Sequence, residues 1–185
     1  MALTPPRAIL ITAVVIASLV AIGRAEGELC ASPPISLGHL NSAIAQPAVP
    51  FAENVIADGQ LAVDQETHRT IGDVLDQVVA CSNAGEPLRV WSLYSDAYIS
   101  RLFQIQGPFT DIQYEAYARP QPGGEEMRLE RVERVWLRPD GKVGADVVMR
   151  YPSVPMPKRL LFWFAVAEDQ TEIEEVTGEI SFSLP

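Results

Sequence analysis

The sequence holds little of what most metal and nucleophile sites are built from. Its 185 residues include two cysteines and two histidines, and neither His39 nor His68 has other metal ligands at a recognised spacing. It contains no P-loop, no dinucleotide-binding glycine pattern and no Ser-His-Asp signature. The sequence therefore predicts neither a metal centre nor a cofactor, and both histidines are expected at the surface.

Basic residues are scarce as well. Lys and Arg number 14 against 24 Asp and Glu, which gives a formal net charge of −10. Two of the basic residues, Arg7 and Arg24, lie in an N-terminal segment that we expect to be removed, so the mature chain would carry about −12. Such a surface repels phosphate backbones and anionic lipids. Nucleic acid is therefore not an expected partner.

Residues 1–25 have the layout of a secretory signal peptide. Arg7 precedes an uninterrupted apolar run over residues 8–22, and Gly23-Arg24-Ala25 supplies the small-residue pattern of a cleavage site. The apolar run is shorter than the roughly 20 residues of a membrane-spanning helix. We expect cleavage after Ala25 and export to the extracellular space or the cell envelope. A membrane anchor formed by the uncleaved segment is the alternative.

Export would place Cys30 and Cys81 in an environment that permits one disulfide. The alternative is that Cys81, which ends an apolar run, is a small buried hydrophobic residue. Residues 26–63 are rich in proline and have no sustained period, so they are expected to be an extended lead-in without chemistry. Residues 64–185 are expected to form a single domain.

The first third of this domain is predicted to be helical. Apolar residues recur at helical spacing over residues 71–79, and Asn83-Ala84-Gly85 ends that helix. Pro87 suits the first turn of a second helix. Ser95 or Asp96 can cap a third.

The rest of the domain is predicted to be a sheet. Residues 104–126 contain several prolines and glycines and are expected to form a long irregular connection. The hydrophobic pattern then indicates strands at 129–138, 142–150, 160–167 and 171–181. Pro139-Asp140-Gly141 joins the first two of these strands in a tight turn. Helices followed by antiparallel strands predict an α+β fold with the helices on one face of a curved sheet.

Three short runs stand in a distinctive order, Ala80-Cys81-Ser82-Asn83-Ala84-Gly85-Glu86, Leu93-Tyr94-Ser95-Asp96 and Leu137-Arg138-Pro139-Asp140-Gly141-Lys142-Val143-Gly144-Ala145. Their order and spacing resemble small secreted bacterial proteins of the nuclear transport factor 2-like superfamily, over about residues 70–176. The resemblance implies a cone-shaped fold in which a strongly bent sheet wraps around helices and leaves a pocket. Its members include ketosteroid isomerase, scytalone dehydratase, limonene epoxide hydrolase and polyketide cyclases, and also proteins that only bind. Thr171 departs from the pattern, which has a tryptophan there.

The enzymes of this superfamily use general acid–base chemistry, which needs an acidic side chain inside the pocket. Asp96 and Asp146 are the candidates. Asp96 lies beside Tyr94 and Tyr98, but Ser-Asp at a helix start also suits a helix cap, which is the interpretation we favour.

The pairing register of the hairpin determines which face of the sheet Asp146 lies on. A three-residue loop places Arg134 opposite Asp146 and Trp136 opposite Gly144 on one face, and leaves an almost purely apolar opposite face. Asp146 is therefore predicted to be a solvated partner of Arg134 rather than a pocket base.

Five aromatic residues are candidates to line a ligand pocket, with core packing as the alternative: Trp91, Tyr94, Tyr98, Phe103 and Trp163. The sequence thus predicts an exported domain that binds a small apolar ligand or a partner and is not catalytic. The alternative is an isomerase, dehydratase or cyclase that uses Asp96 or Asp146 with a tyrosine.

The predicted strand at 160–167 is apolar on both sides, so both of its faces need cover. The helices can cover only one of them. We expect a homodimer to cover the outer face, with the lead-in and the connection at 104–126 as alternatives.

Overall fold

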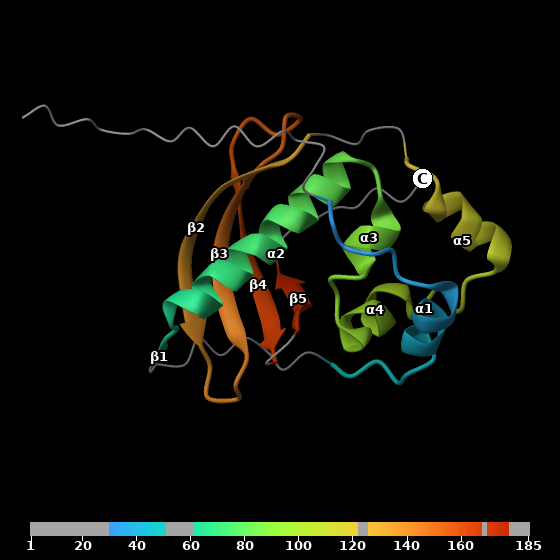
Figure 1. Ribbon diagram of the computed structural model, residues 1–185, viewed down its shortest axis with the longest axis horizontal. Helices are drawn as coiled ribbons and strands as arrows, with labels where there is room; N and C mark the ends of the chain where they lie inside the picture. Colours follow the sequence, from blue (N-terminus) through green and yellow to red (C-terminus); the bar gives the residue numbers. More distant parts are fainter. Residues whose placement is uncertain (1–29, 51–60, 122–125, 168–169, 178–185) are drawn as a thin grey trace, which may run out of the picture.

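The computed structural model describes residues 30–50, 61–121, 126–167 and 170–177. The predicted signal peptide lies outside this range. Within the described residues, five helices and an antiparallel sheet give the predicted α+β architecture. Figure 1 shows helix α2 crossing one face of the sheet, with the other helices gathered beside the β5 edge. Among the described residues, no helix combines the length and the hydrophobicity needed to cross a bilayer.

Helix α2 (Gln65–Asn83) is the helix predicted from the periodicity of residues 71–79. The Asp64 carboxylate caps it by accepting a hydrogen bond from the Thr67 N–H at 2.7 Å. Beyond its C-terminus Gly85 has a φ of 69°, which favours glycine. The Gly85 carbonyl accepts the Gln121 N–H at 2.8 Å, so the end of α2 is tied to a distant segment.

Helix α1 (Leu37–Ile44) lies within the lead-in, where an extended chain was expected. That prediction was wrong for these eight residues. The Ser36 hydroxyl caps the helix by accepting the His39 N–H at 3.2 Å. Three apolar residues at helical spacing then pack into the core, namely Leu40, Ala43 and Ile44.

A disulfide joins Cys30 to Cys81 and fixes the lead-in to α2. The two Cα atoms are 4.7 Å apart, within the range that a disulfide requires. Of the two alternatives left by the sequence, the structure contains the disulfide.

The remaining helices are short: α3 (Pro87–Trp91), α4 (Asp96–Phe103) and α5 (Asp111–Ala118). Helix α5 falls in the connection that was predicted to be irregular, and that prediction was wrong for residues 111–118. A capping box makes the helix, because the Thr110 hydroxyl accepts the Gln113 N–H while the Gln113 side chain accepts the Thr110 N–H.

The sheet is an open meander in the order β1-β2-β3-β4-β5. Its strands are β1 (Leu61–Ala62), β2 (Arg128–Leu137), β3 (Val143–Arg150), β4 (Lys158–Val166) and β5 (Thr171–Thr177). The β2–β3 turn is the predicted one: the Arg138 N–H donates to the Lys142 carbonyl at 2.8 Å, and Gly141 has a φ of 83°. At the other edge, the Ile173 N–H donates to the Leu93 carbonyl at 2.8 Å, which fastens the helices to β5.

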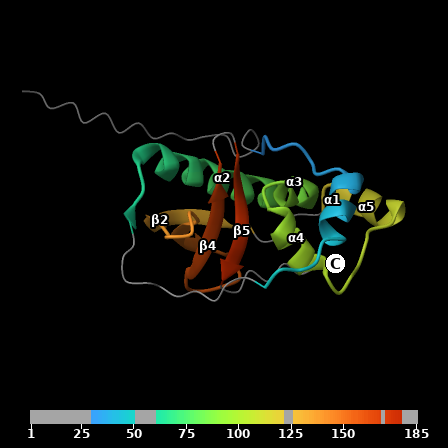
Figure 2. The same ribbon diagram turned by 90° about the horizontal axis from the view of Figure 1, so that it is seen from below.

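The core lies between the inner face of the sheet and the helices (Figure 2). Alternate residues of β3 and β4 point into it: Val143, Ala145, Val147, Met149, Leu160, Phe162 and Phe164. At the helical end, rings fill the space, with Trp91 4.8 Å from Phe103 and 5.1 Å from Tyr117 between ring centroids. Such contacts fix the helices against one another.

Candidate functional site

Asp96 does not face a tyrosine. The favoured prediction that Asp96 caps a helix was wrong, because Ser95 caps α4 and Asp96 follows it in the first turn. The Asp96 carboxylate lies 2.7 Å from His39 Nε2 and 3.2 Å from Gln46 Nε2, at the surface between α4 and α1. His39 is 58% exposed, so its predicted surface position is confirmed, and His68 is exposed on α2.

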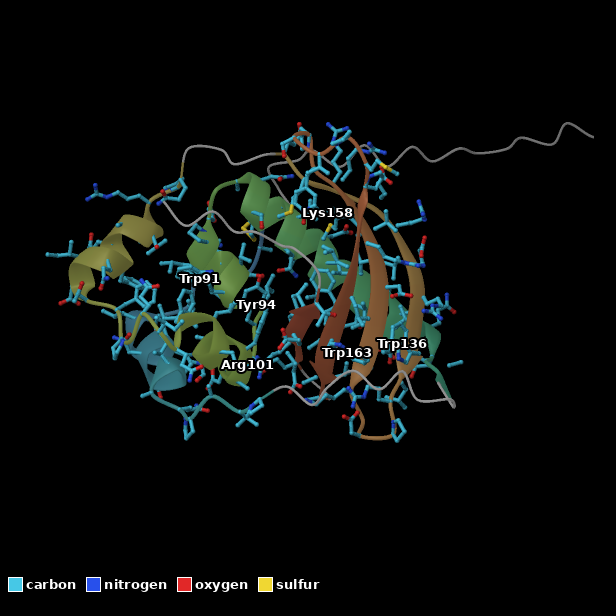
Figure 3. The ribbon with its side chains drawn as sticks, turned by 180° about the vertical axis from the view of Figure 1, so that it is seen from behind. Trp91, Tyr94, Arg101, Trp136, Lys158 and Trp163 are labelled. Atoms are coloured by element: carbon cyan, nitrogen blue, oxygen red, sulfur yellow. A yellow bond between two sulfur atoms is a disulfide. The ribbon has the colours of Figure 1, made fainter. Side chains whose placement is uncertain are left out.

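The five predicted pocket residues are all buried, but they do not form one group. Trp91, Tyr94, Tyr98 and Phe103 belong to the core cluster, whereas Trp163 lies on the opposite face of the sheet (Figure 3). Burial raises the pKa of Tyr94 and of Tyr98 well above the usual value of 10. The rings of these two tyrosines are 4.9 Å apart and pack on each other.

Two surface hollows are lined by residues other than these five aromatic ones. One of about 280 Å³ lies between the start of α2 and the β4–β5 turn, and one of about 180 Å³ lies between α3 and α5. None of the five aromatic residues lines either hollow. Within the described part of the chain, no three His, Cys, Asp or Glu side chains are placed to hold a metal ion.

Asp146 points to the outer face of the sheet, away from the helices. Arg134 and Asp146 are cross-strand neighbours, so the predicted register is confirmed. Arg134 donates from Nε at 2.9 Å and from Nη2 at 2.6 Å to the same carboxylate oxygen. The prediction that Asp146 is solvated was wrong, because the residue is 7% exposed. It lies in a central strand between Arg134 and Leu161, and these neighbours shield it.

A tryptophan pair lies further along the same face. Trp136 and Trp163 flank Gly144 from the two neighbouring strands, and their rings meet edge to face at 5.7 Å. A Cβ at position 144 would lie 2.6 Å from one ring and 2.8 Å from the other, so glycine makes the contact possible. The guanidinium groups of Arg134 and Arg138 lie over the two rings, at 5.3 and 4.8 Å from their centroids.

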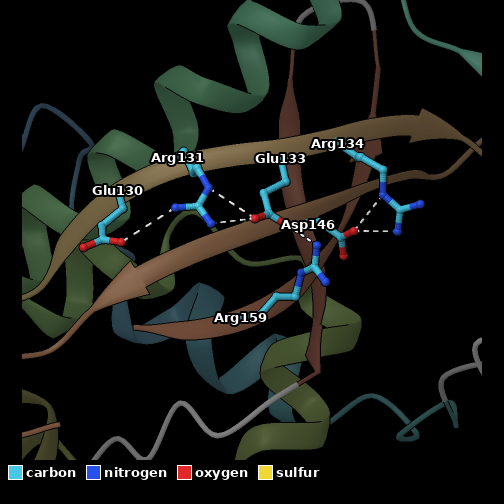
Figure 4. A network of polar contacts seen from close by, with 6 residues as sticks. All are labelled: Glu130, Arg131, Glu133, Arg134, Asp146 and Arg159. Carbon is cyan, nitrogen blue, oxygen red and sulfur yellow. Dashed lines mark hydrogen bonds and ion pairs between the residues drawn. The ribbon is translucent and has the colours of Figure 1, made fainter. Parts of the chain in front are cut away.

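Beyond Asp146 the outer face becomes a row of alternating charges (Figure 4). Arg131 and Arg159 flank Val148 from either side, and both bind Glu133, Arg131 at 2.7 Å through Nη2. Glu130 lies 4.0 Å from Arg131 and also pairs with Arg150. We call the set drawn in Figure 4 the arginine ladder: Glu130, Arg131, Glu133, Arg134, Asp146 and Arg159.

No protein-family model, curated protein or solved structure matches the chain.

Two irregularities in β2 create the ladder. Residue 130 and residue 133 are each extra on β2 relative to β3, because Leu129 and Arg131 pair with consecutive residues of β3, as do Val132 and Arg134. An extra residue of this kind is a β-bulge. Each bulge lets two consecutive charged residues share the outer face, while the apolar residues between them stay turned to the core.

Sequence reasoning missed the ladder although the signal is present. Residues 130–135 read Glu-Arg-Val-Glu-Arg-Val, a tandem repeat of three residues. A period of three fits neither a flat strand, whose period is two, nor a helix, whose period is 3.6. Within a strand, the repeat is satisfied by one bulge per unit.

The electrostatics of the ladder favour its charged form. Hydrogen bonds from Arg131 and then from Arg159 lower the pKa of Glu133 below its usual 4.5. The arginines remain open to solvent: the side chains of Arg131, Arg134 and Arg159 are 59%, 56% and 63% exposed. The ladder thus presents three half-solvated guanidinium groups on a strand-built, rigid surface.

Proposed function

We propose that the chain is an exported interaction domain of the nuclear transport factor 2-like superfamily, with a cone-shaped fold, that docks on a protein partner through the outer face of its sheet. The observation that carries the proposal is the arginine ladder. Arginine is enriched in protein interfaces because its planar guanidinium binds carboxylates in a defined geometry and also stacks on aromatic rings. Here the guanidinium groups of three arginines are held by carboxylates, while more than half of each arginine side chain stays exposed.

The interior gives less support to a small-ligand site. Four of the five aromatic residues that were candidates for a pocket wall pack against neighbouring rings in the core. The acid–base alternative would need Asp96 or Asp146 beside an interior tyrosine. Asp96 instead contacts His39, and Asp146 contacts Arg134 on the outer face.

The test is partner capture that depends on the ladder. The tagged full chain is expressed in its own host, cross-linked in place, purified and analysed by mass spectrometry. Wild type is compared with Arg131→Gln/Arg159→Gln and with a control of equal charge change, Arg69→Gln/Arg119→Gln, whose residues lie on α2 and beyond α5. We expect one protein to be recovered with wild type and control and lost with the ladder variant. Recovery of the same proteins by both variants would contradict the proposal.

A homodimer through this face stays a prediction. Trp136 and Trp163 are 5% and 1% exposed in a single copy, so these two residues do not need a second copy as cover. A dimer in light scattering at micromolar concentration, disrupted by Arg131→Gln/Arg159→Gln, would make a second copy the partner. A monomer would leave the face to another protein.

A further inference from the structure

We infer that the surface docked on the arginine ladder is an acidic protein surface. This inference rests on the proposed function and adds the chemistry of the partner. It starts from an uneven distribution of charge along the chain. Residues 126–159 contain five acidic residues and eight basic ones, and the basic ones are Arg128, Arg131, Arg134, Arg138, Lys142, Arg150, Lys158 and Arg159. That segment is therefore net +3 in a chain whose formal charge is −10, which leaves −13 for the remainder.

The fold gathers this basic segment on the sheet. It makes up β2, β3, their turn and the start of β4, which are adjacent in the sheet. Besides the three ladder arginines, Arg128 and Arg150 are 65% and 47% exposed. Arg134 uses Nε and Nη2 for Asp146, and a guanidinium has five N–H donors, so it can bind a second carboxylate from outside. This segment is net positive on an otherwise acidic molecule, which favours one orientation of approach for an acidic partner.

The interleaved carboxylates argue for a protein rather than a nucleic acid or an anionic membrane. Glu130, Glu133 and Asp146 lie among the arginines, so a uniform polyanion would meet negative charge at close range. The net charge of −13 on the remaining chain would also repel such a polyanion at long range. A protein surface can place acidic groups against the arginines and donors against the carboxylates, which is how charge pattern gives specificity.

The test uses a labelled peptide in which Glu is interspersed with Asn as the acidic probe, so that it offers both carboxylates and amide donors, with fluorescence anisotropy at neutral pH and low salt. We expect the full chain to bind the peptide despite its net negative charge, and added salt to weaken the binding because exposed charges are screened beyond ~8 Å at physiological ionic strength. Arg131→Gln/Arg159→Gln should weaken the affinity about five- to tenfold, from two lost exposed contacts. The control Arg69→Gln/Arg119→Gln has the same charge and should change it less than about twofold.

Two comparison probes are single-stranded polydeoxythymidine and vesicles that contain phosphatidylserine. Binding to either as tightly as to the mixed Glu-Asn peptide would overturn the inference and indicate a general polyanion site. Absence of peptide binding, or equal loss in the two variants, would also overturn it. The proposed function fails separately, when partner capture from the host is unaffected by the ladder variant. A ladder-dependent partner without peptide binding would leave the function standing and remove the acidic-surface inference.

Discussion

The ion pair of Arg134 and Asp146 should respond unequally to loss of its two members. The Asp146 side chain is 10% exposed, whereas the Arg134 side chain is 56% exposed. Removal of the arginine leaves a carboxylate that is nearly cut off from water, and an unpartnered buried charge costs several kcal/mol. Removal of the carboxylate leaves a guanidinium that water can still solvate. Loss of the arginine should therefore be the more damaging change.

The magnitudes follow from these exposures. Arg134→Met keeps an apolar stem over Trp136 and removes the charge, and we expect it to lower the free energy of unfolding by about 2 to 4 kcal/mol. Asp146→Asn should cost about 1 kcal/mol, near the upper end for exposed pairs. The double variant should be more stable than Arg134→Met alone, because the buried charge is gone.

Urea unfolding followed by far-UV circular dichroism measures all three variants, with the free energy taken from the midpoint at constant slope. The exposed pair of Arg69 and Asp73 on α2, 67% and 52% exposed, supplies the matched control. Arg69→Met there should cost no more than about 0.5 kcal/mol. If Asp146→Asn costs as much as Arg134→Met, or the double variant is the least stable of the three, then burial of the carboxylate does not govern this pair and the reasoning fails.

Four further predictions test other parts of the structure. Gly144→Ala should destabilise the fold by about 1 to 3 kcal/mol and change the near-UV circular dichroism, because the new methyl group overlaps both Trp136 and Trp163. Reduction of the Cys30–Cys81 disulfide, which spans 51 residues, should cost about 4 kcal/mol in the loop-entropy estimate, measured as a lower urea midpoint in dithiothreitol. Burial raises the pKa of the Tyr98 hydroxyl in the folded protein. The stability that this tyrosine contributes is therefore complete below the pKa of tyrosine in the unfolded chain, about 10, and is lost as the pH rises above that value. Tyr98→Phe should flatten the fall in melting temperature between pH 9 and 11. The pKa of Glu133 is lowered in the folded protein, so the stability that this carboxylate contributes is present above its unfolded pKa near 4.5 and is lost as the pH falls below that value. Glu133→Gln should therefore reduce the fall in melting temperature that acid causes.

The elements that could be predicted from sequence are those in which local pattern and tertiary packing agree. Helix α2 has a long apolar stripe at helical spacing, and the β2–β3 turn has the residues that its backbone needs. Helices α1 and α5 could not be predicted in the same way, because each has eight residues inside a segment punctuated by proline or glycine. Packing of the Leu40 side chain fixes α1, and a capping box fixes α5, which has no fully buried residue.

The same distinction applies to the candidate site. The pairing of Arg134 with Asp146 followed from the β2–β3 turn and from the alternation of apolar and polar residues next to it, where the pairing of the two strands is regular. The burial of Asp146 did not follow, because only its neighbour on β2 was considered, and Leu161 of β4 pairs with it from the other side. Glu130 and Glu133 were missed since alternation was assumed along the whole of β2, and the two bulges break it.

A strand that is apolar on both sides does not by itself require a dimer to cover its outer face. Strand β4 is apolar on both sides, yet Trp163 is 1% exposed in one copy of the chain. Part of the cover comes from arginine side chains, whose stems and flat guanidinium groups lie over aromatic rings while their charged edges stay in water. Around the tryptophan pair the surface left for a partner is consequently charged, although the residues beneath the arginines are aromatic. The two bulges of β2 extend the charged surface further along the strand, because they keep Glu130 beside Arg131 and Glu133 beside Arg134 on the outer face, where a regular strand would turn one member of each pair toward the core.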